Sequence, residues 1–93
     1  MTDDADLDKA RTIAAAWGLT DPEAQQLLDD PRCVSCVLNI DDSLCRIYPT
    51  QERARAWPVR PNRVFDDKTP LDVMLSGGIE QVRKYLRYHV YNA

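Results

Sequence analysis

The sequence predicts an all-α fold, a compact single-domain bundle of about five to six short helices. Apolar residues recur at spacings of three and four along most of the 93-residue chain, which is the period of an amphipathic helix. Residues that begin and end helices separate these stretches. No stretch shows convincing strand alternation, because Pro61 interrupts the β-branched residues between positions 59 and 65. A chain of this length supports one modest hydrophobic core.

Residues 1–30 predict two short helices. The first runs from about Asp6 to Trp17 and ends at Gly18. Thr20 and Glu23 then form a capping-box pattern that opens the second helix. The expected apolar faces comprise Leu7, Ala10, Ile13, Ala14 and Trp17 in the first helix and Ala24, Leu27 and Leu28 in the second.

The most apolar helix follows directly and is expected at the centre of the bundle. Asp30 is its predicted N-cap, Pro31 occupies its first position, and Pro49 ends it. Its apolar stripe comprises Cys33, Cys36, Val37, Ile40, Leu44, Ile47 and Tyr48, and it is widened by Val34, Leu38 and Cys45.

Three further helices are expected in the second half of the chain. Thr50 caps a two-turn helix that carries Ala54 and Trp57, and residues 58–68 then form an irregular, extended connection. Thr69 caps a short helix that stops at Gly77-Gly78. Its inward residues are expected to be Leu71, Met74 and Leu75. The last helix runs from about Ile79 to Tyr91, with an inner face of Ile79, Val82, Leu86, His89 and Val90.

Charge and hydropathy restrict the location and the partners of the chain. No apolar run approaches the roughly 20 residues of a membrane span, and residues 1–4 are acidic where a signal peptide is basic. A cytoplasmic protein without a membrane partner is therefore expected. The net charge of −3 divides into ten acidic against four basic residues in 1–49 and five against eight in 50–93. An acidic first half is unsuited to DNA phosphates, whereas the basic second half suits DNA or an acidic protein groove.

The cysteines and the single histidine raise the question of a metal or redox site. Cys33, Cys36, Cys45 and His89 are four groups of the kind that hold zinc, but the second cysteine pair of a structural site is missing. Cys33 and Cys36 also fall on the apolar stripe, where cysteine packs as a small hydrophobic residue. Core packing is the favoured interpretation, and a metal or redox module is a third hypothesis. No residue set resembles an active site or a phosphate loop, so we expect no enzyme, no catalytic residue and no cofactor.

The outer face of the last helix is the best candidate for a binding surface. It carries Arg83, Lys84, Arg87, Tyr88 and Tyr91, with Asn92 and Ala93 beyond. Arginine and tyrosine are enriched at the energetic centres of protein interfaces. A solvated face with tyrosines lying along the surface is the alternative, and composition alone does not separate the two.

Several motifs resemble the toxin-binding domain of the Xre/MbcA/ParS antitoxins. These are Leu38-x-Ile40 with Leu44, Ala54-x-x-Trp57, Pro61-Asn62-x-x-Phe65, Thr69-Pro70-Leu71-x-x-Met74, Gly77-Gly78, Val82 and Leu86. The resemblance covers roughly residues 34–90. It implies a small all-helical type II antitoxin that binds and silences a RES-domain toxin, which degrades NAD or uses it for ADP-ribosylation. It also implies that the C-terminal region occludes the toxin active site, and it adds Asn62 and Arg63 to the expected toxin-binding residues.

Two departures from the family pattern are informative. Asp67 stands where the family usually has glycine before the Pro-Leu helix. Longer members carry an N-terminal helix-turn-helix, and residues 18–28 resemble only its start, because Asp29-Asp30 leads directly into the central helix. We therefore divide the chain into a truncated helix-turn-helix-like segment, 1–30, and a toxin-binding domain, 31–93. DNA binding is expected to be weak or absent, and a small DNA-binding regulator is the runner-up hypothesis.

The oligomeric state stays open at this point. The apolar first helix with Trp17 suits either a homodimer within a toxin–antitoxin complex or packing on the chain's own core.

Overall fold

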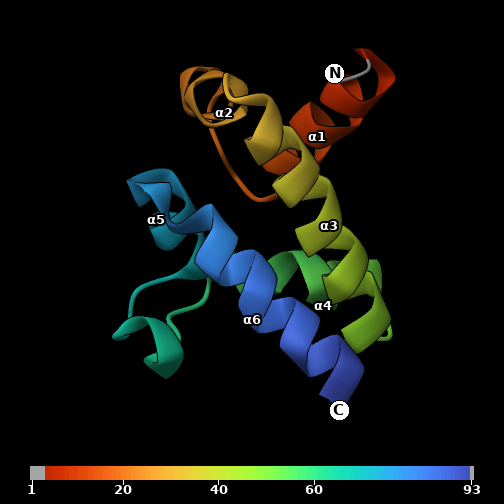
Figure 1. The fold of residues 1–93 in the computed structure, drawn as a ribbon, viewed down its shortest axis with the longest axis vertical. Helices are drawn as coiled ribbons and strands as arrows, with labels where there is room; N and C mark the ends of the chain where they lie inside the picture. Colours follow the sequence, from red (N-terminus) through yellow and green to blue (C-terminus); the bar gives the residue numbers. More distant parts are fainter. Residues whose placement is uncertain (1–3, 93) are drawn as a thin grey trace.

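The computed structural model describes residues 4–92 and contains six α-helices in that range, which confirms the predicted all-α fold (Figure 1). The helices are α1 (Asp4–Ala16), α2 (Asp21–Leu28), α3 (Pro31–Ile47), α4 (Gln51–Ala56), α5 (Pro70–Val73) and α6 (Ile79–Asn92). Three shorter helical turns, η1 (Trp57–Val59), η2 (Arg63–Phe65) and η3 (Met74–Gly78), lie between them.

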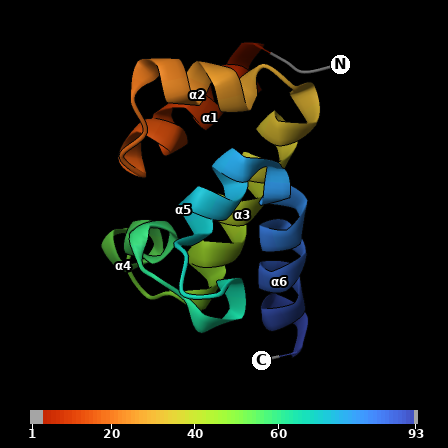
Figure 2. The same cartoon turned by 90° about the vertical axis from the view of Figure 1, so that its left-hand side faces the viewer.

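The helices form two groups along the long axis of the molecule. The α1–α2 pair lies across one end, and α3 and α6 pack side by side along the rest (Figures 1 and 2). Both α3 and α6 run away from the α1–α2 end, so their C-terminal ends are neighbours at the opposite end. Among residues 4–92 there is no helix with the length and hydropathy needed to cross a membrane.

One hydrophobic core runs through the whole described chain. Its most buried large side chains include Trp17 from the α1–α2 connection, Ile40 and Leu44 from α3, and Leu86 from α6. Burial of such side chains is the dominant favourable contribution to folding, at roughly 1.5–3 kcal/mol each. The Trp17 side chain is only 1% exposed, so this face of α1 packs on the chain's own core.

The predicted helix starts are confirmed by their caps. Thr20 and Glu23 make the reciprocal capping box, with the Thr20 amide donating to Glu23 Oε1 at 3.0 Å and the Glu23 amide donating to Thr20 Oγ1 at 3.4 Å. The side chains of Asp30, Thr50 and Thr69 accept amide hydrogens from the first turns of α3, α4 and α5. Each such cap typically stabilises a protein by about 1 kcal/mol. The caps explain why short segments with modest apolar content form helices here.

The connection over residues 58–68 is more ordered than the sequence analysis expected. It contains η1 and η2, and an isolated bridge joins Asn62 to Lys68. The Asn62 Oδ1 atom accepts the Val64 amide hydrogen at 3.0 Å, so the side chain itself closes the η2 turn. Asp66 and Asp67 follow with left-handed φ values of 57° and 65°. The expected extended connection is thus replaced by two short helical turns, because local backbone hydrogen bonds and the Asn62 side chain satisfy its backbone groups.

The predicted stop at Gly77-Gly78 is a sharp bend between two helices. Gly77 has a φ of 95°, which favours glycine, and the chain then passes directly from η3 into α6. A Cβ atom on Gly78 would lie 2.6 Å from Val73 Cγ1, so glycine also permits the close approach of α5 at this point. The two glycines therefore fix the angle at which α6 leaves α5.

Two residues that were expected inside the core are on the surface. Cys45 is exposed because it follows the buried Leu44 by one position, which rotates it about 100° around α3. Leu75 follows the buried Met74 in the same way and is 38% exposed. The predicted inward position of Leu75 is therefore wrong.

Candidate functional site

Two grooves flank the last two turns of α6, where its C-terminal end meets that of α3. The carbonyl ends of both helices lie here, and each carries a partial negative charge of about half an electron. That field favours cationic side chains at this end of the molecule. Arg46, in the last turn of α3, occupies such a position.

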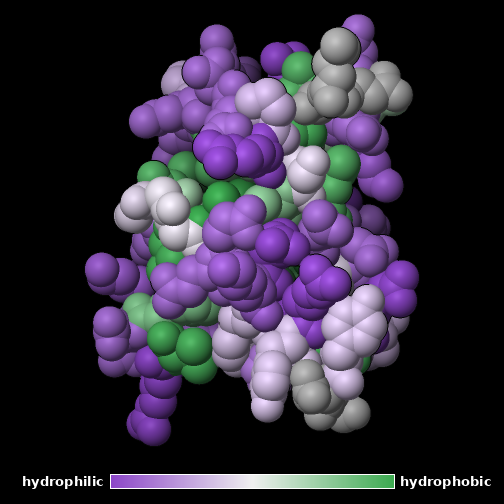
Figure 3. All heavy atoms as spheres, viewed as in Figure 1, coloured by the Kyte–Doolittle hydropathy of each residue, from purple (hydrophilic) through white to green (hydrophobic). Residues whose placement is uncertain are grey.

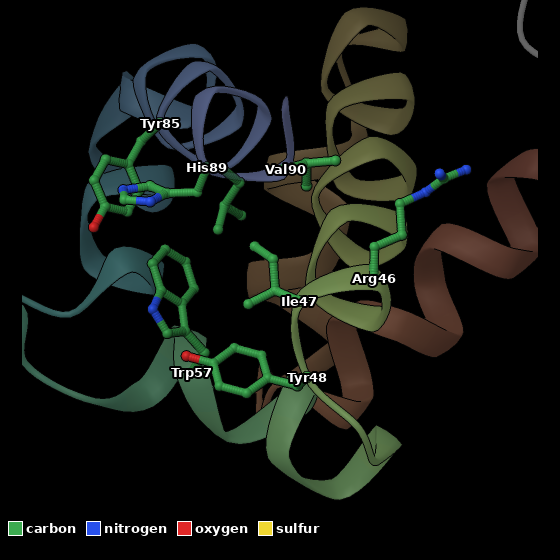
Figure 4. Close-up of a pocket in the computed structure, with 8 residues that line it drawn as sticks. Arg46, Ile47, Tyr48, Trp57, Tyr85, His89 and Val90 are labelled. Carbon is green, nitrogen blue, oxygen red and sulfur yellow. The ribbon is translucent and has the colours of Figure 1, made fainter. Parts of the chain in front are cut away.

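The first groove is largely aromatic, and we call it the aromatic groove. Its volume is about 350 Å³. In Figure 4 Ile47 and Val90 extend into the space from one side and Trp57, Tyr85 and His89 border it from the other, while Arg46 points away from it. The lining residues are Arg46, Ile47, Tyr48, Trp57, Tyr85, Leu86, His89 and Val90.

Ring–ring contacts hold the wall of the aromatic groove in place. The Trp57 and Tyr85 rings are stacked, with centroids 6.2 Å apart and planes inclined by 11°. Phe65 meets both edge-on, at 6.4 Å from Trp57 and 5.5 Å from Tyr85. His89 lies 4.4 Å from Tyr85. Aromatic pairs of this kind contribute about 0.5–1.5 kcal/mol each beyond buried area, so the wall is formed before any partner arrives.

The mouth of the aromatic groove contains two residues, Ile47 and His89, that were expected on the buried faces of their helices. Ile47 is 38% exposed and His89 is also exposed. The spacing of both residues matches the buried stripes of their helices, but α3 ends at Ile47 and no further turn covers His89. The predicted inner position of His89 is therefore wrong, and both side chains border an open groove.

The second groove is polar, and we call it the arginine groove. It holds about 250 Å³ between α3 and α6 on the face shown in Figure 3, where hydrophilic side chains cover the two helices. Arg46 and Val90 line both grooves, so the two are adjacent. The lining residues are Asn39, Asp42, Ser43, Arg46, Arg83, Arg87, Val90 and Tyr91.

The charges of the arginine groove are only partly neutralised. Arg46 Nε lies 3.0 Å from Asp42 Oδ2, and Arg83 lies 2.9 Å from Glu80. The hydrogen bond to Glu80 raises the pKa of Arg83 above its usual value. Within residues 4–92 Arg87 makes no ion pair, and its guanidinium carbon lies 5.8 Å from the Tyr91 ring centroid. Arg87 is thus available to an anionic group from outside.

The cysteines contribute little reactive chemistry. Cys36 is buried and donates a hydrogen bond to Glu80 Oε1 at 3.2 Å, while Cys33 is half-buried. Burial raises the pKa of the Cys36 thiol to about 11 and also raises the pKa values of Cys33 and Cys45. The thiolate is the nucleophile and metal ligand, so these shifts disfavour both roles. Across residues 4–92 no three His, Cys, Asp or Glu side chains gather as a metal site would require.

Comparison with known proteins identifies the family. The antitoxin Xre/MbcA/ParS C-terminal toxin-binding domain matches residues 43–89. The chain belongs to this family. Apart from Val90, every residue that lines the aromatic groove lies within the matched part of the toxin-binding domain. The same span contains Arg83 and Arg87 of the arginine groove.

A curated relative adds a second comparison. The uncharacterized protein y4oB of Sinorhizobium fredii (strain NBRC 101917 / NGR234) is 41% identical over 56 residues. The match covers 57% of this chain and 43% of the relative, so the chain spans less than half of the relative's length. No solved structure matches the chain.

The toxin-binding residues predicted from the sequence do not form one site. Arg83, Arg87 and Tyr91 line the arginine groove. Lys84 and Tyr88 are exposed on α6 but line neither groove, and Tyr88 is 65% exposed. Asn62 and Arg63 lie at η2 and line neither groove. Asn92 is the last residue of α6, and Ala93 falls outside the described residues.

Tyr85 and Tyr48 are the main groove residues that the sequence analysis missed. Tyr85 lies three positions after the buried Val82 and four before His89, a helical spacing that marks one continuous face. That spacing was the available signal for Tyr85. The apolar stripe of the central helix includes Tyr48, but its place in the groove depends on how α4 folds back against α3.

Proposed function

We propose that this chain is the antitoxin of a type II toxin–antitoxin system and neutralises a RES-domain toxin in the cytoplasm. It acts as a stoichiometric inhibitor and not as an enzyme. The observation that carries the proposal is the family match over residues 43–89, together with the exposed Arg and Tyr side chains on the part of α6 that borders two grooves. The RES class follows from the sequence resemblance, and the toxin would degrade NAD or transfer its ADP-ribose.

The C-terminal region supplies the inhibition in this proposal. The last turn of α6 lies at the end of the molecule farthest from α1 and α2 (Figure 2). Tyr88 and Tyr91 are 65% and 76% exposed, so both present a large side-chain surface at this end of the molecule. A helix end that projects beyond the core can enter a cleft without disturbing the fold. We propose that residues 88–93 occlude the active-site cleft of the toxin.

The test is coexpression with the RES-type protein encoded by the adjacent reading frame. Removal of residues 88–93 is expected to restore NAD loss and growth arrest, whereas the full chain protects. The last buried core residue of α6, Leu86, remains in the truncated chain, so far-UV circular dichroism should still report a helical fold. Full protection by the truncated chain would refute occlusion by the C-terminal region. Lack of any adjacent RES-type frame, or lack of binding, would refute the RES partner itself.

We further propose that residues 1–30 are a helix-turn-helix-like remnant with a structural role, and that DNA binding is weak or absent. In support of this, α3 follows α2 after only Asp29 and Asp30 and contributes Val34, Val37 and Ile40 to the core. The two basic residues of α3, Arg32 and Arg46, are already paired with Asp30 and Asp42, so this helix is poorly suited to DNA phosphates. A promoter-shift assay over a salt series tests the regulator alternative, which requires strong, steeply salt-dependent binding by the chain alone.

A further inference from the structure

Of the described tail residues, 88–92, only His89 and Val90 line the aromatic groove, so most of that groove has no role in occlusion by the C-terminal tail. The tail residue Tyr91 lines the arginine groove, and Tyr88 lines neither groove. We propose that the aromatic groove receives a bulky apolar side chain of the toxin, beside a carboxylate that pairs with Arg87, and that this contact supplies most of the affinity. This inference rests on the proposed function, and it assigns binding and inhibition to different residues.

The size of the groove fits an inserted side chain. Its volume of about 350 Å³ is at the small end of ligand pockets, which span roughly 300–1,000 Å³. That space suits one or two large side chains of a docked segment. Leu86 at the base is 2% exposed, so an entering apolar group meets an apolar floor. Trp57 and Tyr85 form a rigid wall of the residue types that dominate interface energies.

The charged side chains near the aromatic groove indicate which type of toxin residue lies next to the inserted apolar side chain. Arg46 stands on the border between the two grooves and is already paired with Asp42. Arg87 stands nearby without an ion pair in the described part of the chain. A segment that fills the aromatic groove and extends toward Arg87 is therefore best matched by an acidic residue next to its apolar side chain.

The same charges disfavour a second copy of this chain as the occupant. A two-fold dimer uses the same patch on both subunits, so it would bring Arg46 and Arg87 toward their own copies. The match of the toxin-binding domain to residues 43–89 contains both arginines and almost the whole groove lining. These two observations together favour the toxin.

The decisive comparison uses two aliphatic residues of equal exposure. Ile47 at the groove mouth and Leu75 in η3 are both 38% exposed, and Leu75 lines neither groove. Calorimetric titration with the catalytically inactivated RES-type protein of the adjacent reading frame is expected to show that Ile47→Glu raises Kd roughly 30-fold or more. Leu75→Glu should leave Kd within about threefold. His89→Glu, a second exposed position at the groove, should resemble Ile47→Glu.

A shorter truncation separates binding from inhibition. Removing residues 91–93 leaves every residue of the aromatic groove in place, so this chain should still bind the toxin but should no longer prevent NAD loss. Binding that is lost with residues 91–93, or that survives both groove substitutions, would overturn the inference while leaving the proposed function intact. Failure of the full chain to bind would instead remove the proposed function. Self-association that Ile47→Glu abolishes would identify the occupant as a second copy and also overturn the inference.

Discussion

The Cys36 thiol donates a hydrogen bond to Glu80 Oε1 at 3.2 Å and so joins the first part of α3 to the first turn of α6. Arg83 binds the other carboxylate oxygen at 3.0 Å. The Arg83 bond and then the Cys36 bond lower the pKa of Glu80 below its usual value. The two helices are thus tied together at one end, which leaves their C-terminal ends to form the two grooves.

This arrangement predicts an order of thiol reactivity. Cys45 is exposed, Cys33 is half-buried, and Cys36 is buried with a pKa raised to about 11. Because the thiolate is the reacting form, Cys45 should be alkylated first and Cys36 last at neutral pH. Time-resolved alkylation with iodoacetamide, read by peptide mass spectrometry, measures the three rates. In denaturant the differences should largely vanish, and a fast-reacting Cys36 in the native protein would contradict the assignment.

The same thiol predicts a loss of stability at alkaline pH. The unfolded thiol ionises near its ordinary pKa of 9.0, whereas burial raises the pKa of the folded thiol to about 11. The folded state therefore holds more protons between these values, so the free energy of unfolding falls as pH rises through them, by on the order of 2 kcal/mol. Urea unfolding of the wild type and of Cys36→Ala over pH 8–11 measures the difference, since other titrating groups are common to both. An equally steep fall in Cys36→Ala would contradict the prediction.

The sequence predicted those parts of the fold that local interactions determine. The caps at Thr20, Asp30, Thr50 and Thr69 need only residues within one turn, and all four are present. The central position of α3 also follows from its apolar stripe, because Ile40 and Leu44 must be covered on folding.

The grooves could not be predicted in the same way. The spacing that buries Leu86 in α6 also applies to His89, and only the end of the neighbouring helix α3 decides that His89 stays open. The meeting of Tyr48, Trp57 and Tyr85 depends on three separate elements and on the direction in which α6 leaves Gly77. Such tertiary placement leaves no periodic signal in the chain. The sequence therefore predicted a binding face on α6, with residues of the arginine groove, but it did not predict the aromatic groove.

Asp67 stands where the family usually has glycine, and this difference has a structural consequence that can be measured. This residue has a φ of 65°, a left-handed conformation that costs most L-residues about 1–2 kcal/mol and costs glycine little. Asp67→Gly should therefore raise the free energy of unfolding, by about 0.5–1 kcal/mol once the greater freedom of the unfolded glycine chain is subtracted. Asp72→Gly is the matched control. Asp72 lies in the right-handed first turn of α5, and its replacement should destabilise the protein by about 0.5–1 kcal/mol in the same urea titration, because helix propensity and a favourable first-turn charge are both lost.

Arg87 and Lys84 provide a final test of the arginine groove, because they carry the same charge on the same helix. Arg87 lines the groove without an ion pair in residues 4–92, whereas Lys84 lines neither groove. Arg87→Ala should weaken toxin binding about tenfold at low ionic strength, because a directed pair with a toxin carboxylate is lost. The difference from wild type should shrink as salt screens the exposed part of that pair.

Lys84→Ala removes the same net charge but should change Kd by less than about threefold. Titrations at two salt concentrations measure both effects, and equal losses for the two variants would indicate general attraction between the proteins instead of a contact at this groove.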